Sequence, residues 1–178
     1  IDKDTSGVMI VAKNPEIYEF LKEQFQNRET KKVYRAILSG AVKLKIGEEK
    51  VIDLPIGRSQ NDPRRRVANV KADGILREAV TVFRLIANLG DKYAYVEAEP
   101  KTGRTHQLRA HFKAYHHPII GDSLYNPSDD GGGAINRPAL HAYRLAIKIS
   151  PEKEEAQIFE APLPLDFIQA LEKLRATC

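Results

Sequence analysis

Short apolar runs bounded by glycine, asparagine or proline predict most of the strands of this chain. A run of about four to eight apolar residues between turn residues is typical of a strand. Such runs predict strands at residues 8–12, 32–39, 50–54, 66–71, 79–86, 93–98, 142–149 and 157–161. The run 8–12 contains no polar residue and is expected to be buried. The sequence Asn88-Leu89-Gly90-Asp91 predicts a hairpin-like connection between two of the strands.

Apolar residues three or four positions apart predict three helices. Asn14 and Pro15 form a typical helix start, and the stripe that follows consists of Ile17, Phe20, Leu21 and Phe25. Thr105 is expected to cap a second helix that runs to about Ala114. Residues 165–176 predict a third helix, whose inward residues are expected to be Phe167, Ile168, Leu171 and Leu174. The glycines at 131–133 predict a flexible loop.

The order of these elements predicts an α+β fold with a largely antiparallel or mixed sheet. Strands outnumber helices, and neighbouring strands are joined by hairpin-like connections rather than by helices. With 178 residues, of which 42% are hydrophobic, the chain is expected to form one domain over residues 1–178. It begins without Met and within a motif, so we expect a fragment of a protein that continues upstream.

Composition excludes several classes of protein. No run of about 18 apolar residues is present to cross a membrane. The single cysteine, Cys178, cannot form an internal disulfide, which fits a reducing, cytoplasmic compartment. His106, His111 and His116 are five residues apart, unlike the four-residue spacing of helical metal ligands, so we expect no metal site. His141, in an apolar stretch, is expected to be a hydrogen-bonded core residue.

Positive charge is concentrated in two segments. The net charge of the whole chain is +4, and residues 58–71 and residues 101–121 each carry +4 as well. The first segment contains Arg64, Arg65 and Arg66 in a row. Such segments are either solvated loops or a surface that binds a polyanion.

The segment Gly103–Arg109 combines a glycine turn, two arginines and a predicted helix start. Free backbone N–H groups and the helix dipole at such a start favour an anion. The segment could bind a phosphate, pair with a carboxylate, or form an Arg–Asp bridge that only orders the turn. Two further candidates are Asp2, held at a sheet edge by Thr5-Ser6-Gly7, and Tyr34, which is either packed in the sheet or a face for a base to stack on.

Taken in order, five blocks resemble the catalytic domain of the RluA-type pseudouridine synthases. The resemblance extends over essentially the whole chain. The blocks are Asp2-x-x-Thr5-Ser6-Gly7, Lys32-x-Tyr34-x-Ala36, Gly103-Arg104-Thr105-His106-Gln107-Leu108-Arg109, His117-Pro118-Ile119-x-Gly121-Asp122-x-x-Tyr125 and Leu140-His141-Ala142. The family's His-Arg-Leu ahead of the aspartate is absent, and Ile1 stands in its last position.

This resemblance implies isomerisation of uridine to pseudouridine in structured RNA, ribosomal or transfer, without metal or cofactor and with no obligate protein partner. It implies a mixed, mostly antiparallel central sheet flanked by helices. By motif position Asp2 is the catalytic carboxylate, Arg104 pairs with it, and Tyr34 stacks on the target base. The remaining candidate substrate contacts are Thr105, His106, Arg109 and Leu140, and the candidate phosphate contacts are Arg64, Arg65 and Arg66.

Alternatives remain open at this point. The carboxylate could attack C1′ of the ribose directly or abstract the 2′ proton and pass through a glycal-like intermediate. A non-catalytic RNA-binding module on the same fold is the second hypothesis. A hydrolase acting on a small phosphorylated substrate is the third, and it depends only on the anion-binding character of Gly103–Arg109.

Overall fold

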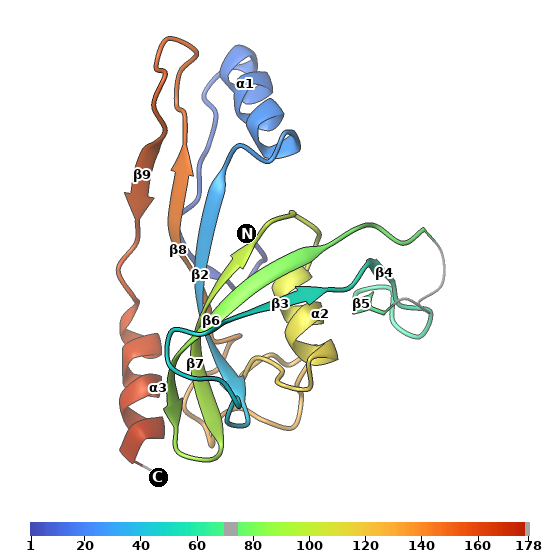
Figure 1. Ribbon diagram of the computed structural model, residues 1–178, viewed down its shortest axis with the longest axis vertical. Coiled ribbons are helices and arrows are strands. Elements are labelled where there is room, and N and C mark those ends of the chain that lie inside the picture. The colour runs from blue at the N-terminus through green and yellow to red at the C-terminus, as the bar shows by residue number, and fades with distance from the viewer. Residues whose placement is uncertain (70–74, 177–178) are drawn as a thin grey trace.

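A seven-stranded sheet organises the molecule in the computed structural model, which describes residues 1–69 and 75–176 (Figure 1). The main path of the sheet is β1-β8-β2-β7-β6-β3, and β9 also pairs with β8. Its strands are β1 (Ser6–Gly7), β2 (Lys31–Ser39), β3 (Glu49–Asp53), β6 (Val80–Leu89), β7 (Tyr93–Pro100), β8 (Leu140–Ile147) and β9 (Gln157–Glu160). Among these, the β1–β8 pair is parallel and the other pairs are antiparallel. The predicted mixed, mostly antiparallel α+β architecture is confirmed.

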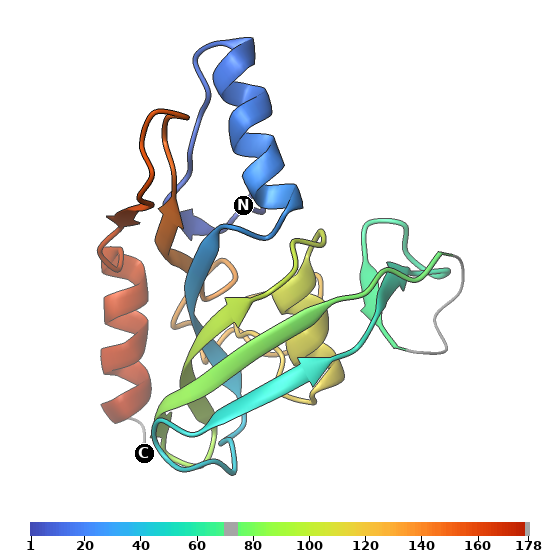
Figure 2. The same cartoon turned by 45° about the horizontal axis from the view of Figure 1, so that its top comes forward.

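Two helices cover opposite faces of this sheet (Figure 2). Phe83 of β6 packs edge-on against Phe112 of α2 (Gln107–Ala114), with ring centroids 5.4 Å apart. Tyr95 of β7 contacts Phe167 of α3 (Leu165–Ala176), with ring centroids 6.2 Å apart. Because side chains alternate along a strand, and Ala98 is the cross-strand partner of Phe83, Tyr95 points away from the α2 face. The buried core therefore extends from both faces of the sheet.

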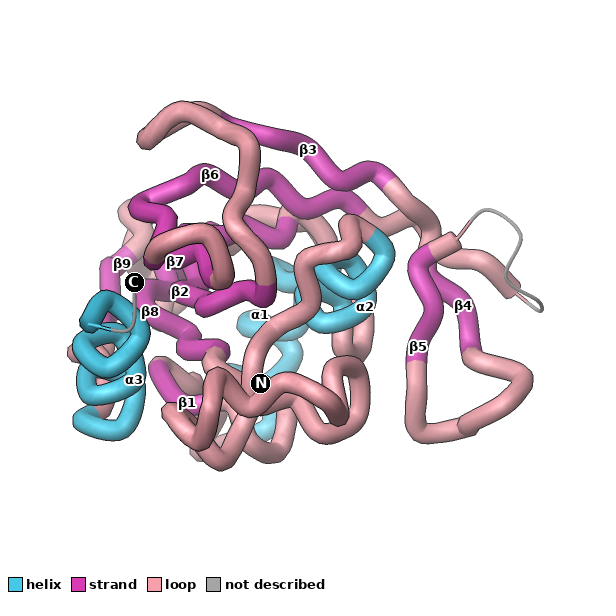
Figure 3. The backbone as a smooth tube through the Cα atoms, turned by 90° about the horizontal axis from the view of Figure 1, so that it is seen from below, coloured by secondary structure: helices cyan, strands magenta, loops and turns pink. Residues whose placement is uncertain are grey.

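A small hairpin stands apart from the main sheet (Figure 3). It consists of β4 (Ile56–Arg58) and β5 (Arg66–Ala68), paired antiparallel, with the arginine-rich loop between them. The sequence did not predict β4, which has only three residues with Gly57 at the centre. The predicted strand 66–71 is confirmed for Arg66–Ala68, and its residues 70 and 71 lie outside the described residues.

The predicted buried strand at residues 8–12 is wrong. The strand ends at Gly7, and the last bond to β8 is donated by the Val8 amide to the Ala142 carbonyl at 2.9 Å. Beyond that point β9 pairs with β8 from Arg144 onward, so the edge that residues 8–12 needed is occupied. Met9 and Val11 are instead exposed, while alternate residues pack in a small cluster under α1 (Pro15–Gln26).

Helix α1 begins where the sequence predicted, with the Asn14 side chain accepting from the Ile17 amide at 2.9 Å. It is fixed to the end of β8 by Gln24, which donates to the Lys148 carbonyl and accepts from the Lys148 amide, both at 2.9 Å. Helix α3 has the predicted bounds, but Ile168 is 38% exposed and Ala170 is fully buried instead. Residues 131–133 lie outside helices and strands, as predicted for a loop.

Candidate active site

Asp2 lies on a short turn that the parallel β1–β8 pair holds in place. The Thr5 amide donates to the Asp2 carbonyl at 3.0 Å, which closes the turn. Gly7 has φ of 121°, and a Cβ atom there would lie 2.2 Å from the Ala142 carbonyl oxygen, so only glycine allows this close approach. The position of Asp2 therefore depends on a glycine at position 7, where β1 approaches β8 closely.

His141 supports the same turn from the sheet. Its Nε2 bonds to the Ala161 carbonyl at 3.0 Å, and because a carbonyl only accepts, that nitrogen carries the proton. Its Nδ1 then accepts from the Ser6 hydroxyl at 2.9 Å. Burial lowers the pKa of His141, which favours this neutral form. The expectation of a hydrogen-bonded core histidine is confirmed.

Arg109 joins two carboxylates. Its Nη1 donates to Oδ2 of Asp2 at 3.3 Å, while Nε and Nη2 donate to the two oxygens of Asp122 at 2.7 and 2.8 Å. Asp122 is fully buried and also accepts from the Leu124 and Tyr125 amides. Such a two-point contact fixes the plane of the guanidinium. Asp122 thus holds Arg109, and Arg109 holds the Asp2 carboxylate.

The predicted pairing of Arg104 with Asp2 is wrong, since the partner of Asp2 is Arg109. The Nε of Arg104 donates to the Glu78 carbonyl at 2.9 Å instead. The helix start explains this direction. The Gln107 side chain accepts from the Arg104 amide and the Thr102 hydroxyl, and donates to Val80 and Thr81. In this turn the Arg104 guanidinium is held by the Glu78 carbonyl and lines the cavity without bonding to Asp2.

Thr105 does not cap α2, contrary to prediction. His106 occupies the cap position with φ of 56°, and its side chain makes no capping bond. Its ring lies on Tyr125, whose hydroxyl is 3.0 Å from Nδ1 and accepts from the Arg66 amide at 2.7 Å. Burial lowers the pKa of His106. The active-site histidine is thereby linked to the arginine-rich hairpin.

A cavity of about 400 Å³ opens at Asp2. Six of the predicted site residues line it: Asp2, Tyr34, Arg104, Thr105, His106 and Leu140. Tyr34 is the cross-strand partner of Ala98 and so stands on the α2 face of the sheet. Burial, together with the Asp2 charge, raises the pKa of Tyr34 to about 12, so the phenol is neutral at physiological pH. The cavity therefore combines charged and polar groups, among them Asp2, Arg104 and His106, with apolar surface from Leu140 and Phe25.

The other predicted residues lie outside this cavity. Arg109 bonds to Asp2 from outside the cavity. Two of the possibilities for the segment Gly103–Arg109 are thus realised together: it pairs with the Asp2 carboxylate, and it forms an Arg–Asp bridge with Asp122. Arg64, Arg65 and Arg66 lie on the β4–β5 hairpin. Of these, Arg66 lines a neighbouring hollow together with Arg104 and Thr105.

Several residues that build the site could not be identified from the sequence. Asp122 and Tyr125 were part of a recognised block, but nothing local in the sequence indicates that they reach Arg109 and His106. Thr5 lines the cavity, and its buried hydroxyl has no hydrogen-bond partner among the described residues. That hydroxyl is available to a bound molecule.

Neither a metal cluster nor a membrane span is found in the part of the chain that the structure describes. No group of three or more His, Cys, Asp or Glu side chains there could hold a metal ion. No helix within residues 1–69 and 75–176 is long and apolar enough to cross a bilayer.

Sequence comparisons with known proteins all indicate one family. The model of a family described as RNA pseudouridylate synthase matches residues 1–114. A Bacillus subtilis (strain 168) protein named uncharacterized RNA pseudouridine synthase YhcT is 39% identical over 169 residues, covering 93% of this chain and 52% of that protein. Ribosomal large subunit pseudouridine synthase D of Neisseria meningitidis serogroup A is 38% identical over 184 residues, covering 98% of this chain and 47% of that protein.

Solved structures show the same fold. The structure of human RNA pseudouridylate synthase domain containing 1 aligns with a TM-score of 0.76 at 27% identity, covering 99% of this chain and 78% of that one. Human RNA pseudouridylate synthase domain containing 4 aligns with the same TM-score at 26% identity, covering 98% and 74%. The chain spans about half the length of the curated relatives that it matches.

Proposed function

Because the chain belongs to the RNA pseudouridylate synthase family, we propose that it converts uridine to pseudouridine in structured RNA, with Asp2 as the catalytic carboxylate. The observation that carries this proposal is the Asp2 carboxylate, held by Arg109 at a cavity lined by Tyr34 and Leu140. A carboxylate fixed in one orientation beside a flat, partly apolar pocket suits attack on, or proton removal from, the ribose of an extruded nucleotide.

The reaction is an isomerisation and needs no co-reactant. The bond between N1 of uracil and C1′ breaks, the base turns within the pocket, and C5 bonds to C1′. The proton on C5 is lost and N1 gains one. Asp2 supports either open route, by bonding to C1′ or by removing the 2′ proton. Tyr34 and Leu140 line the cavity in which the base turns, and the neutral phenol of Tyr34 adds no charge to that surface.

The RNA substrate is proposed to be ribosomal or transfer RNA, encountered in the cytoplasm and without an obligate protein partner. The relatives named as large-subunit enzymes favour ribosomal RNA. Thr105, His106 and Arg104 line the cavity and are proposed to contact the target nucleotide, while Arg109 acts by positioning Asp2. Arg64, Arg65 and Arg66 are proposed to bind phosphates. Such contacts offset the few kcal/mol that extrusion of a base costs.

The test is release of tritium from RNA labelled at C5 of uridine, using the full-length protein. Asp2→Asn is expected to abolish release while RNA binding is retained. Asp4→Asn, which changes an exposed carboxylate on the same turn, is the matched control and is expected to stay active. Full release by Asp2→Asn would overturn the role of Asp2. RNA binding without release by the unmodified protein would favour the non-catalytic hypothesis.

A further inference from the structure

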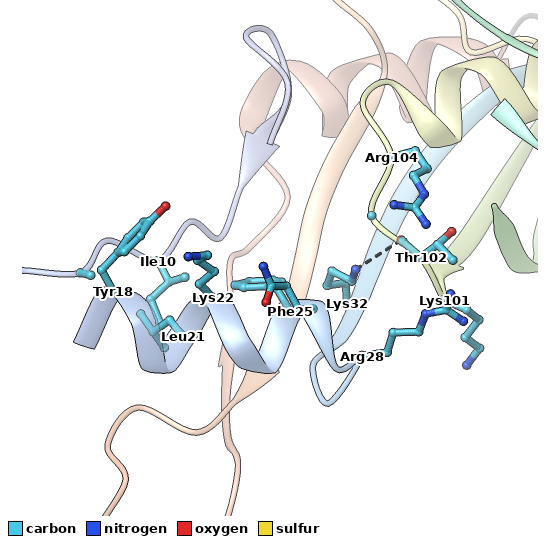
Figure 4. Close-up of a pocket in the computed structure, with 13 residues that line it drawn as sticks. Ile10, Tyr18, Leu21, Lys22, Phe25, Arg28, Lys32, Lys101, Thr102 and Arg104 are labelled. Atoms are coloured by element: carbon cyan, nitrogen blue, oxygen red, sulfur yellow. Dashed lines mark hydrogen bonds between the residues drawn. The ribbon is translucent and has the colours of Figure 1, made fainter. Parts of the chain in front are cut away.

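A second hollow, of about 650 Å³, adjoins the active-site cavity and has no role in the proposed chemistry (Figure 4). One wall comes from α1 and the segment before it, and the other from the start of β2 and the turn after β7. We call it the α1 groove. Five residues line both the α1 groove and the active-site cavity: Phe25, Lys32, Thr102, Gly103 and Arg104. A molecule extending from the active site can therefore continue directly into the groove.

The lining of the α1 groove is positively charged. It includes the cations Lys22, Arg28, Lys32, Lys101 and Arg104, and no aspartate or glutamate lines it. Lys22 and Arg28 pair with the exposed carboxylates of Glu19 and Glu78, and Lys101 pairs with Glu99, which is 25% exposed. Exposed pairs of this kind are worth about 0–1 kcal/mol, so a phosphate can take the place of the carboxylate at little cost.

Lys32 lies at the junction of the two hollows. Its ammonium donates to the Thr102 carbonyl at 3.3 Å and lies 6.0 Å from the centre of the Phe25 ring. It has no carboxylate within ion-pair distance among the described residues. Burial lowers the pKa of Lys32, as expected for a cation that lacks a counter-charge. An anionic ligand at this junction would supply that counter-charge.

Two aromatic rings of α1 contribute to the same groove. Tyr18 is 56% and Phe25 is 40% exposed, and neither belongs to a core cluster of the molecule. They are seven residues apart, so both lie on one face of α1. Figure 4 shows Lys22 between them. Exposed aromatic rings interleaved with cations are the usual features of a site for single-stranded nucleic acid, where bases stack and phosphates pair.

We propose that the α1 groove binds the nucleotide adjacent to the target uridine. Its base packs on the face of α1 that carries Phe25 and Tyr18, the phosphate that joins it to the uridine is held by Lys32 at the junction, and its other phosphate is held by Lys22. The proposal rests on the proposed function, since it assumes that the active-site cavity takes a uridine. It assigns α1, which lies outside the main sheet, a part in selecting an RNA with two neighbouring extruded nucleotides. The second nucleotide adds a stacking contact, worth about 1–3 kcal/mol per base in comparable sites.

The test uses Asp2→Asn protein, so that no chemistry occurs, and measures binding of uridine monophosphate and of the trinucleotide UpUpU by calorimetry or NMR titration. Tyr18→Ala combined with Lys22→Ala changes residues that line the α1 groove only. This variant is expected to bind UpUpU about 5- to 100-fold more weakly, with binding of uridine monophosphate unchanged. Phe159→Ala, which removes a 37% exposed ring from β9, is the matched control and is expected to change neither.

A second measurement separates this proposal from the proposed function. In the active protein the double variant is expected to raise the KM for RNA with little change in kcat. Failure of the unmodified protein to release tritium would count against the enzyme activity, but would leave the trinucleotide measurement valid. Equal affinity of variant and parent for UpUpU would overturn the groove proposal, and so would an equal loss for both ligands.

Discussion

Arg109 and Arg64 belong to the two segments of equal net charge, but they occupy opposite environments. The Arg109 side chain is 10% exposed and bonds to Asp122 and Asp2. Arg64 is 77% exposed and pairs with Asp62, two residues away on the same loop. The charge of Arg109 is compensated by two carboxylates inside the protein. The charge of Arg64 is compensated only by Asp62, in an exposed ion pair that solvent weakens. Equal charge along the chain therefore does not mean equal capacity to bind RNA.

The two ion pairs also differ in how much they contribute to the free energy of folding. Removing one partner of a buried ion pair leaves an uncompensated charge and costs about 3–5 kcal/mol, whereas an exposed pair contributes about 0–1 kcal/mol. The cluster of Asp2, Arg109 and the fully buried Asp122 therefore couples the position of the Asp2 carboxylate to folding. The exposed Arg64–Asp62 pair of the β4–β5 hairpin can change its contacts at little cost in folding free energy.

The largest effect is expected for Arg109→Met. This change leaves Asp122 fully buried without its cation, and we expect a loss of about 3–5 kcal/mol in the free energy of unfolding. Urea unfolding measures it, and Arg64→Met is the matched control, expected to lie within about 0.5 kcal/mol of the parent. Similar losses in both variants would show that the distinction between the two regions is wrong.

Gly7→Ala is expected to have the next largest effect. The new methyl group would lie 2.2 Å from the Ala142 carbonyl oxygen, so β1 must move away from β8 and take Asp2 away from Arg109. We expect a cost of about 1–3 kcal/mol and loss of tritium release. Gly47→Ala is the control, because Gly47 also has positive φ but no atom within 4 Å of the added carbon. An active Gly7→Ala protein would contradict the role given to the β1–β8 pair.

The two regions should also respond differently to acid. Burial lowers the pKa of His111, whose Nε2 donates to the Leu54 carbonyl, so the unfolded chain binds a proton at a pH where the folded chain does not. The contribution of His111 to the free energy of unfolding is therefore fully present above a pH of about 6.5. It is lost as the pH is lowered, by at most about 1.4 kcal/mol per pH unit for this one proton. Hydrogen bonds with Arg64 lower the pKa of Asp62 to about 2, so the hairpin pair keeps its charges over the same range.

Unfolding measured between pH 7.5 and 5 tests this expectation. His111→Gln is expected to reduce the slope of stability against pH, leaving the share contributed by His106 and His141, whose pKa values burial also lowers. A slope unaffected by His111→Gln would exclude this histidine as the titrating group.

The smallest effect on stability is expected for the combined change of Arg64, Arg65 and Arg66 to Gln. The free energy of unfolding should change by less than about 0.5 kcal/mol per site, because surface pairs contribute little. RNA affinity should fall. The slope of the logarithm of the binding constant against the logarithm of the salt concentration should become shallower by about 0.7–0.9 for each lost phosphate contact. Filter binding at several salt concentrations measures this. A constant slope would identify the hairpin as a solvated loop.

Local patterns predicted those elements whose structure is decided locally. The α1 start at Asn14 and Pro15 and the bounds of α3 follow from capping and periodicity, and both are confirmed. The strand at residues 8–12 failed because its outcome depends on a distant competitor. Strand β9 takes the edge of β8, and no pattern within residues 8–12 reveals this.

The candidate site divides in the same way. The family motifs located Asp2, Tyr34, His106 and Leu140, and one cavity brings them together. They did not give the partner of Asp2, because Arg104 and Arg109 both follow the same glycine turn. The Glu78 carbonyl holds the Arg104 side chain, and the carboxylate of Asp122 holds Arg109 beside Asp2. Such choices depend on contacts between segments far apart in sequence.

The pairing of β1 with β8 sets the order in which the protein can become functional during synthesis. Ser6 pairs with His141, and Asp2 bonds to Arg109, so residues 2–7 can reach their final positions only after residues more than 100 positions later have been synthesised. Contacts between residues so far apart in sequence form late, because closing the loop between them costs entropy before the contact stabilises the fold. We therefore expect a nascent chain shorter than about residue 142 to lack an assembled carboxylate site. Asp2 would then be among the last of the site residues to reach its final position.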